Sequence, residues 1–437
     1  MDVYEQAGRI VHSCLTFKGS AKSLCLKKEI QKKKQTYAIV CSTLCHIKII
    51  DAVIESLQIL EQISEHIHQR NKNYFKSLIR VFAYECIFGK GLKVNSGPAR
   101  FLESKRTAMK KNYENLKNLV EFRQESMPNS EADSNVNVRV NYLKEKRNPS
   151  YFTSTLPGTI DPIFPDLFNT PSASLSSRHS LVKKGNLILQ NRPSCLPAHC
   201  ICEAMDSFWN VVDACASPGN KTTHICALHK WKVESKGAHA DKRLRVMAIE
   251  KDTDRFNTLR ERISVLGASD FVTCLHGDFL QFQWSQADVI LCDPTCSANR
   301  DCSSERFVNL ARFQIRLLLH ALLDFPAARC VSYSTCTLNQ IENELVVSMA
   351  LEIASSHGWN LHHALPDWPH RGVHLDSSIS PECYEKCYPR DKRETMPDIS
   401  TAPVQFNEQS AVHCLRNPEP YPFFVAIFKR ELSEASI

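Results

Sequence analysis

The alternation of short apolar runs with helical patterns, from about residue 185 onward, constrains this chain more than any other feature. Six apolar runs are typical of buried strands, at residues 209–214, 244–249, 271–275, 287–292, 329–333 and 423–428. Four segments between them have the spacing of helices, at residues 221–229, 254–266, 306–323 and 339–355. Strands that alternate with helices form a parallel sheet with helices on both faces. The sequence therefore predicts an α/β domain over residues 187–437.

Residues 211–222, with the sequence VVDACASPGNKT, are the first motif, because they join a predicted strand to a predicted helix. Open α/β sheets bind ligands at this end of their strands. Glu250 ends the next strand, where a carboxylate can accept hydrogen bonds from two ribose hydroxyls. The spacing matches neither a dinucleotide-binding glycine motif nor a phosphate loop. A tight turn and a surface acid would explain each piece alone. Small residues in the motif let a ligand approach the backbone closely, at Ala214, Ala216, Ser217 and Gly219.

Two cysteines follow two other predicted strands. The segment DVILCDPTCS places Asp293 at the end of the fourth strand and Cys296 three residues later, and VSYSTCTL places Cys336 at the end of the fifth. We expect a helix to begin just after Cys336, and amide groups at a helix N-terminus lower the pKa of a cysteine. Most of the 19 cysteines are explained as small buried apolar residues. Two at neighbouring strand ends, one of them beside Asp293, favour nucleophilic chemistry.

The first 122 residues differ from the rest of the chain. Apolar residues recur every three or four positions at 37–60 and 75–87, which predicts a helical domain over residues 1–122, with Gly89 and Gly91 as stop signals. Residues 1–120 carry a net charge of +11, from 21 Lys+Arg and 10 Asp+Glu, whereas the remainder carries −4. This asymmetry favours a polyanion partner, although a solvated helical surface explains it about as well. RNA phosphates or a nuclear import receptor could bind the lysine cluster, which comprises Lys27, Lys28, Lys32, Lys33 and Lys34.

Residues 123–186 are rich in Pro, Ser, Thr and Asn, which predicts a loop-rich connector with little regular structure. Only residues 136–141 alternate as a short strand does. No apolar run approaches the length of a membrane span, and the first ten residues lack a signal core, so we expect neither membrane insertion nor secretion. No two cysteine pairs share the spacing of a zinc site, so no metal is expected.

Together, the motifs around Asp213, Asp293, Cys296 and Cys336 resemble the Nop/Sun family of RNA cytosine-5 methyltransferases. The segments 18–20 and 84–91 resemble its fifth-paralogue subgroup, whose members modify large-subunit ribosomal RNA. The resemblance implies a Rossmann-like, seven-stranded S-adenosylmethionine-dependent methyltransferase domain after a basic α-helical N-terminal domain. It also implies that residues 123–186 keep a remnant of an RNA-binding segment. Ribosomal RNA would be the substrate of a monomer in the nucleus and nucleolus, with a pre-ribosomal particle as a candidate partner.

The resemblance also implies roles for single residues. Cys336 would be the nucleophile that adds to cytosine carbon 6, Cys296 would assist release of the product, and Asp293 would contact both cofactor and cytosine. Glu250 would hold the ribose of S-adenosyl-L-methionine, Arg255 would lie beside the cofactor, and Asp278 would approach its adenine. Residues of the first motif would line the rest of the cofactor site: Cys215, Ala216, Ser217, Pro218, Gly219, Asn220 and Lys221.

Three departures from the family pattern leave alternatives open. Ala298, Asn299 and Arg300 stand where a Gly-Ser-Gly run is usual, Asn191 where an acid is common, and Glu250 where Asp is more usual. A catalytically weakened member that acts as an RNA-binding ribosome-assembly factor is therefore the main alternative. A DNA cytosine methyltransferase would pair its fourth-strand cysteine with a Glu-Asn-Val motif, which is not evident here. A small-molecule methyltransferase would not need a basic extension of this size.

Overall fold

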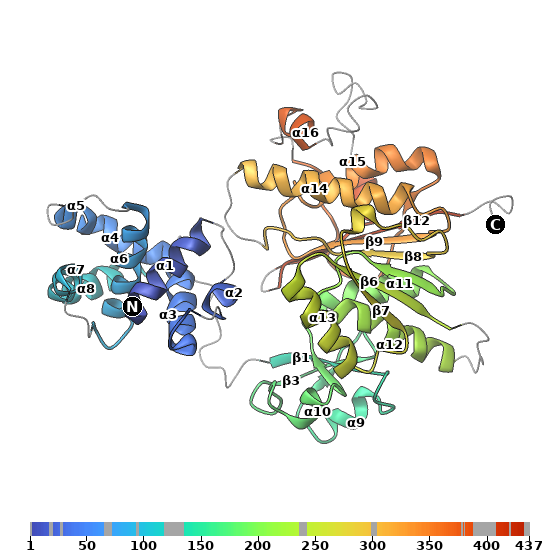
Figure 1. Ribbon diagram of the computed structural model, residues 1–437, viewed down its shortest axis with the longest axis horizontal. Helices are drawn as coiled ribbons and strands as arrows, with labels where there is room; N and C mark the ends of the chain where they lie inside the picture. The colour runs from blue at the N-terminus through green and yellow to red at the C-terminus, as the bar shows by residue number, and fades with distance from the viewer. Residues whose placement is uncertain are drawn as a thin grey trace. The chain divides into compact units, whose positions relative to one another are not determined.

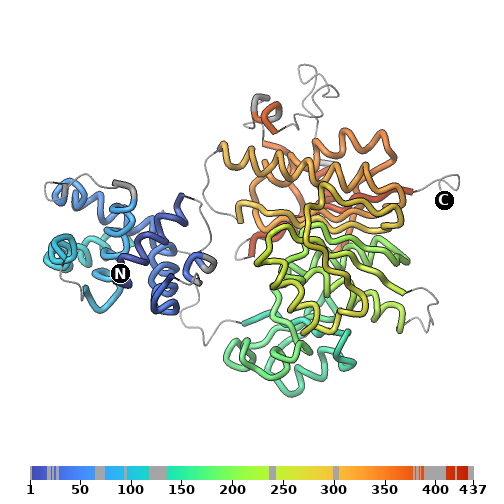
Figure 2. The backbone as a smooth tube through the Cα atoms, viewed as in Figure 1, coloured from blue at the N-terminus to red at the C-terminus, as the bar shows by residue number. Residues whose placement is uncertain are grey.

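The structure is a computed structural model of the whole chain, which divides into two compact units, Met1–Asn129 and Ser130–Ile437. Figure 1 shows the helices and strands of each unit, and Figure 2 traces the backbone through them. No single helix among the described residues is long and apolar enough to cross a membrane, although one bent pair, Lys33–Cys45 with Ile47–Ser56, meets the length and composition test. The structure describes residues 2–16, 21–26, 29–64, 72–92, 96–117, 135–235, 243–298, 304–376, 379, 381–387, 408–418 and 421–431.

The first unit is helical throughout its described residues. Its helices are α1 (Val3–Leu15), α2 (Ala21–Leu26), α3 (Lys33–Cys45), α4 (Ile47–Ser56), α5 (Ile59–Ser64), α6 (Lys72–Ile87), α7 (Gly97–Ser104) and α8 (Arg106–Leu116). Helix α6 packs against α1, α3, α4, α7 and α8, and buries Ile79, Val81 and Phe82. It ends just before Gly89, as the sequence predicts.

The predicted lysine cluster of the first unit is described only in part. Lys32 and Lys34 are exposed at the start of α3. Lys27, Lys28 and the segment 18–20 lie outside the described residues. The positive charge of these two described lysines is therefore on the surface, where a polyanion can reach it.

The second unit is built on a mixed sheet with the strand order β10-β12-β9-β8-β5-β6-β7, and β11 pairs with β12. Strands β5, β6, β7, β8 and β9 pair in parallel, whereas β12 is antiparallel to both β9 and β10. This arrangement confirms the predicted Rossmann-like α/β fold. The strands are β5 (Asn210–Asp213), β6 (Arg245–Glu250), β7 (Val272–His276), β8 (Val289–Cys292), β9 (Cys330–Thr335), β10 (Asn360–Leu361), β11 (Leu415–Asn417) and β12 (Phe423–Lys429).

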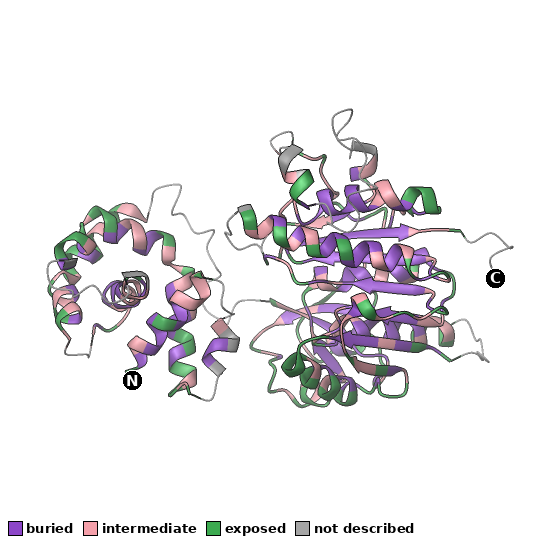
Figure 3. Ribbon diagram, turned by 45° about the horizontal axis from the view of Figure 1, so that its top comes forward, coloured by how far each residue is buried: buried purple, intermediate pink, exposed green. Residues whose placement is uncertain are grey.

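Helices cover both faces of this sheet because its central strands are apolar on both sides. Val212 and Ile290 face one core, which α14 and α15 complete, whereas Val211 and Leu291 face another, which α11, α12 and α13 complete. Figure 3 shows the resulting layer of buried strands between helices with exposed outer sides. The helices are α11 (Leu196–Ala204), α12 (Asn220–Ser235), α13 (Thr253–Val265), α14 (Ser304–Leu323), α15 (Glu344–Ala354), α16 (Pro381–Cys387) and α17 (Glu408–Ala411), with short 3-10 turns η2 (Arg192–Cys195), η3 (Phe279–Gln281) and η4 (Ser355–His357).

A second, antiparallel sheet corrects the prediction of little regular structure between residues 123 and 186. Its order is β2-β3-β1-β4, and its strands are β1 (Asn135–Val140), β2 (Thr159–Ile160), β3 (Leu167–Pro171) and β4 (Leu187–Leu189). Short helices α9 (Pro149–Thr153) and α10 (Ser180–Lys183) complete it. The alternation at 136–141 correctly predicted β1. The other strands have two to five residues, too few for a periodic pattern. Strands β3 and β4 pair with β1, 28 to 51 residues away, whereas β2 pairs with β3, 8 to 10 residues away.

Candidate active site at the carboxyl ends of the strands

The predicted functional residues converge on one edge of the large sheet. Asp213 ends β5 and Glu250 ends β6, while Asp293 directly follows β8 and Cys336 directly follows β9. These four strands are neighbours and run in the same direction. Their carboxyl ends therefore lie side by side, at the edge where open α/β sheets bind ligands.

The turn between β5 and α12 carries the first motif. Gly219 has a φ of +98°, a left-handed conformation that glycine adopts without strain. The turn is tied to neighbouring loops, because Ala216 donates its N–H to the Ile249 carbonyl at 2.9 Å, and Ser217 exchanges hydrogen bonds with Arg255 at 2.9 and 3.0 Å. Cys215 is half-buried, and burial raises the pKa of its thiol, so this cysteine stays neutral. Pro218 is exposed, and the Asn220 side chain accepts a hydrogen bond from Arg262 at 2.6 Å.

The carboxylate of Glu250 fits the expected cofactor. It is 5% exposed, and one oxygen accepts the Asp252 N–H at 2.9 Å. The other oxygen is buried without a hydrogen bond and lies 3.2 Å from the Arg255 guanidinium. A buried acceptor with a free lone pair at the end of the second strand suits a ribose hydroxyl. Asp278, by contrast, is already engaged, because it caps η3 and binds Lys251 at 2.7 Å.

Asp293 lies at the centre of a charged group. One of its oxygens accepts from the Lys221 ammonium at 2.6 Å, and the other accepts from the Ser334 hydroxyl at 2.8 Å. Burial opposes the charge of Lys221, but the Asp293 carboxylate outweighs it and raises the pKa of the lysine. Lys221 and Asp293 are therefore an ion pair at the sheet edge, a contact that the spacing of 72 residues did not reveal.

Cys296 and Cys336 form a sulfur pair beside this ion pair. Their Sγ atoms are 3.1 Å apart, with Cys336 exposed and Cys296 half-buried. The hydrogen bond with Cys296 lowers the pKa of Cys336 and raises the pKa of Cys296, while burial and the Asp293 carboxylate oppose the Cys336 anion and the Lys221 ammonium favours it. The distance allows either sulfur to be the donor, and the lowered pKa of Cys336 favours a thiolate there that accepts the S–H of Cys296.

The prediction that a helix N-terminus lowers the pKa of Cys336 was wrong. The sequence predicted that a helix begins just after Cys336, near residue 339, but α15 begins at Glu344. The residues between Cys336 and Glu344 form turns. The Thr337 hydroxyl accepts a hydrogen bond from the Asn339 N–H, and the Asn339 side-chain oxygen accepts one from the Ile341 N–H. The neighbouring thiol, rather than a helix N-terminus, is therefore the main cause.

The motif around Asp213 was predicted, but the buried contacts of Asp213 and the roles of Glu342 and Asn343 were not, because they depend on partners brought together by the fold. Asp213 is buried and accepts from the Thr222 hydroxyl at 2.7 Å, and burial raises the pKa of this carboxyl to about 6. Glu342 and Asn343 are fully buried below the two cysteine loops. Adjacent polar residues that open an apolar helix were the available signal. Ala298 follows the Cys296 loop, whereas Asn299 and Arg300 lie outside the described residues.

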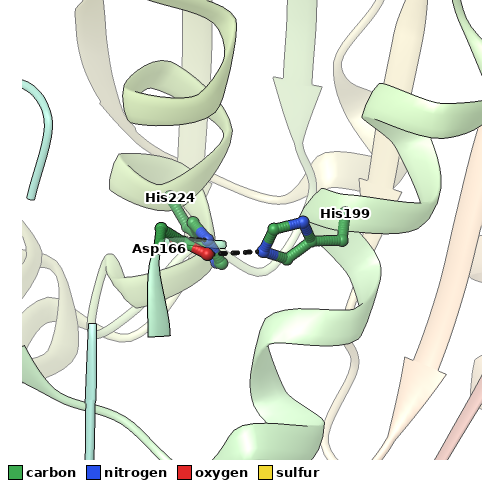
Figure 4. Close-up of side chains that lie close together, drawn as sticks. All are labelled: Asp166, His199 and His224. Carbon is green, nitrogen blue, oxygen red and sulfur yellow. Dashed lines mark hydrogen bonds and ion pairs between the residues drawn. The ribbon is translucent and has the colours of Figure 1, made fainter. Parts of the chain in front are cut away.

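One group of side chains in the described residues could hold a metal ion. Asp166, His199 and His224 have donor atoms within 4.8 Å of one another (Figure 4). Each Asp166 oxygen already accepts from one imidazole, at 2.8 and 2.9 Å. Burial, and then the nearby Arg139 guanidinium, lower the pKa of His224 to about 3. We interpret the group as a hydrogen-bonded cluster that joins the β3 region to α11 and α12, since an added cation would be repelled by Arg139.

Two family models match the chain. The model described as 16S rRNA methyltransferase RsmB/F matches residues 203–365, and the model described as NOL1/NOP2/Sun domain family member 5, N-terminal domain, matches residues 34–126. Among solved structures, the crystal structure of PH0851 has a TM-score of 0.56 at 15% identity and covers 98% of this chain and 99% of its own. A methyltransferase homolog protein from Pyrococcus horikoshii has a TM-score of 0.50 at 17% identity, over 81% of this chain and 95% of its own. These likenesses support the fold.

Two curated relatives resemble the chain over most of its length. A 28S rRNA (cytosine-C(5))-methyltransferase of Mus musculus is 31% identical over 98% of this chain and 91% of its own. The 25S rRNA (cytosine-C(5))-methyltransferase NSUN5 of Arabidopsis thaliana is 32% identical over 81% of this chain, which spans 64% of that relative. The chain therefore belongs to the Nop/Sun family of RNA cytosine-5 methyltransferases.

Proposed function

We propose that this protein methylates carbon 5 of a cytosine in large-subunit ribosomal RNA, with S-adenosyl-L-methionine as methyl donor and Cys336 as nucleophile. The carrying observation is the sulfur pair: Cys336 is exposed, its pKa is lowered, and Cys296 lies 3.1 Å away. The names of the mouse and Arabidopsis relatives support the substrate, since both are cytosine-C(5)-methyltransferases of large-subunit RNA.

The first step uses the Cys336 thiolate. Carbon 5 of cytosine is a poor nucleophile while the ring is aromatic. When the sulfur adds its electron pair to carbon 6, carbon 5 becomes enamine-like and can attack an electrophile. S-adenosyl-L-methionine, when bound, supplies that electrophile as a sulfonium methyl group. The target base must first leave its stack to reach the sheet edge.

The Asp293–Lys221 pair stabilises the ring during this step. Addition of sulfur places negative charge near ring nitrogen 3. Asp293, held between Lys221 and Ser334, would stabilise this charge by sharing a proton with nitrogen 3, while the Lys221 ammonium supplies positive charge to the same region. A positive charge that is already in place stabilises a developing negative charge efficiently, because no group has to reorganise during the reaction.

Cys296 acts at the end of the reaction. The proton on carbon 5 passes to water, and the carbon 6–sulfur bond breaks with its electron pair returning to Cys336. The S–H of Cys296 then donates to the departing thiolate, which reproduces the 3.1 Å contact of the resting site. A stabilised leaving group breaks away faster, so Cys296 promotes release of the methylated RNA.

The cofactor site comprises the β5–α12 turn, from Cys215 to Lys221, together with Glu250, Arg255, Asp278 and Asp293. The buried oxygen of Glu250 that accepts no hydrogen bond, although it pairs with Arg255 at 3.2 Å, supports a role in holding the ribose. For Asp278, contact with the adenine requires that Lys251 share or release its carboxylate. We place the protein in the nucleolus, as a monomer that acts on RNA or on a pre-ribosomal particle.

The test compares wild-type protein with Cys336→Ala and Cys296→Ala. Transfer of labelled methyl groups to large-subunit ribosomal RNA should fall by at least about 10³-fold in Cys336→Ala, because the activating addition is lost. Cys296→Ala should complete about one turnover and then accumulate an RNA–protein adduct that survives denaturing gels. Bisulfite sequencing of the same RNA locates the modified cytosine. Full methyl transfer by Cys336→Ala would exclude the proposal.

A weakened enzyme that acts in ribosome assembly is the second candidate, and Ala298 favours it. This residue has a φ of +55°, in the left-handed region where the family usually has glycine. A strained loop beside Cys296 would slow turnover. Wild-type protein that binds the RNA but transfers no methyl group to it in the same assay would support this candidate.

A further inference from the structure

Glu342 is a fully buried carboxylate directly below the two cysteine loops. One oxygen accepts from the Ser297 N–H at 2.9 Å and from the Gln314 side-chain amide at 3.1 Å. The other oxygen is buried without a hydrogen-bond partner. A buried carboxylate is costly compared with an apolar residue of the same size. The hydrogen bonds that the Glu342 carboxylate accepts therefore indicate its role.

These hydrogen bonds hold the residues on both sides of Cys296. Ser297 follows Cys296 and donates its backbone N–H to Glu342. Thr295 precedes Cys296, and its carbonyl accepts from the same Gln314 amide that binds Glu342, at 3.0 Å. The carboxylate of Glu342 thus determines where the backbone around Cys296 lies.

Asn343, the next residue, holds both sides of Cys336 in the same way. Its side-chain oxygen accepts from the Thr335 hydroxyl at 2.5 Å, and its amide donates to the Thr337 carbonyl at 2.9 Å. Thr335 and Thr337 flank Cys336 in the chain, and both are fully buried. Two adjacent side chains therefore hold two different cysteine loops.

Two further contacts join the loops to each other and to the sheet. The Ser297 hydroxyl donates to the Thr337 hydroxyl at 3.0 Å. The Tyr333 hydroxyl, on β9, donates to the Glu342 carbonyl at 2.6 Å. The 3.1 Å spacing of the two sulfur atoms depends on this set of contacts, since 40 residues separate the cysteines along the chain.

We propose that Glu342 is a positioning residue for Cys296 and so for release of the methylated RNA, while Asn343 positions Cys336 for its addition to the ring. This inference rests on the proposed function, in which the two sulfurs act in different steps. Loss of the Glu342 acceptor leaves the Ser297 N–H without a partner and removes one of the two acceptors of the Gln314 amide, so the Cys296 loop moves while the Cys336 loop keeps both Asn343 contacts.

The experiment uses the full chain and a fragment of large-subunit ribosomal RNA that the wild type methylates. Glu342→Met removes the acceptor at nearly constant volume, Glu342→Gln keeps one acceptor oxygen, and Asn343→Leu is the matched variant of the adjacent buried residue. Single-turnover methyl transfer, steady-state transfer and adduct on denaturing gels are measured for each protein.

Glu342→Met should keep single-turnover transfer near the wild-type rate, lower the steady-state rate at least about tenfold, and accumulate the Cys336 adduct, as Cys296→Ala should. Glu342→Gln should restore most of the steady-state rate. Asn343→Leu should slow single-turnover transfer and accumulate no adduct. A purely structural role would lower both rates together in all three variants.

Equal loss of both rates in folded Glu342→Met without adduct, or wild-type values for both, would overturn the inference. If Glu342→Met does not fold, as judged by thermal unfolding, Gln314→Met decides, because it removes the amide that links Glu342 to Thr295. Gln314→Met should then lower the steady-state rate more than the single-turnover rate, by a smaller factor than Glu342→Met. Equal loss of both rates would count against the inference. Absence of methyl transfer by the wild type would instead count against the proposed function.

Discussion

Cys296 and Cys336 show how one contact between single residues determines reactivity. The S–H of Cys296 lowers the pKa of Cys336, while burial opposes this effect. Cys296→Ala removes the donor, so the pKa of Cys336 should rise and its thiolate fraction at neutral pH should fall. The rate of Cys336 alkylation by iodoacetamide, followed by peptide mass spectrometry, should shift to a higher pH midpoint. An unchanged or lower midpoint would show that another group stabilises the thiolate.

Ala298 is a second residue with a local consequence. Its φ of +55° is unfavourable for an L-residue with a Cβ atom, whereas glycine adopts it freely. Ala298→Gly should therefore raise the free energy of unfolding by about 1 kcal/mol, less the entropy that glycine adds to the unfolded chain. Thermal unfolding of the full-length protein checks this. Gly358, which already has a φ of +82°, provides the reverse control as Gly358→Ala, which should destabilise.

At the scale of elements, the junction of β5 with α12 depends on Asp213. Burial raises the pKa of this carboxyl to about 6, although Thr222 donates to it. Because the folded-state pKa lies above the unfolded value, Asp213 contributes stability at low pH that is lost as pH rises toward 6. Asp213→Asn keeps an acceptor for Thr222 and has no charge. It should be more stable than wild type by about 3 kcal/mol above pH 6, and the difference should shrink near pH 4.

Thermal unfolding of both proteins between pH 4 and pH 7 measures this difference. Thr222→Val, which removes the hydroxyl but leaves the carboxyl, is the control, and it should be less stable than wild type at neutral pH. A stability difference between Asp213→Asn and wild type that stays constant with pH would contradict the prediction.

At the scale of the whole molecule, the basic first unit should supply RNA affinity that is independent of sequence. Lys34, Lys110 and Lys111 are exposed there. Replacing all three with Gln in the full chain should weaken RNA binding and reduce the slope of log affinity against log salt by about one for each lost phosphate contact. Fluorescence anisotropy titrations at salt concentrations between roughly 50 and 200 mM give the slope, because phosphate contacts change affinity strongly in this range. Glu55→Gln, an exposed acid of the same unit, should not weaken binding.

The amino-acid sequence by itself determined the elements with strong local patterns and the places where the large sheet ends. The apolar runs around Val211, Val289 and Val331 are buried on both faces and therefore form central strands in any parallel sheet. Since parallel neighbours end at one edge, the positions of Asp213, Asp293 and Cys336 followed from the order of the strands alone. The helical spacing in residues 37–60 and 75–87 likewise predicted α3 to α6.

Only the tertiary structure decided the features that depend on contacts between distant residues. The sheet of β1 to β4 forms because β1 pairs with β3 and β4, which lie 28 to 51 residues away, and no single segment carries that information. The thiolate at Cys336 arises from Cys296 across 40 residues, and Glu342 with Asn343 holds both loops from below. Local sequence predicts backbone periodicity, but a pKa or the position of a loop depends on neighbours that packing brings together.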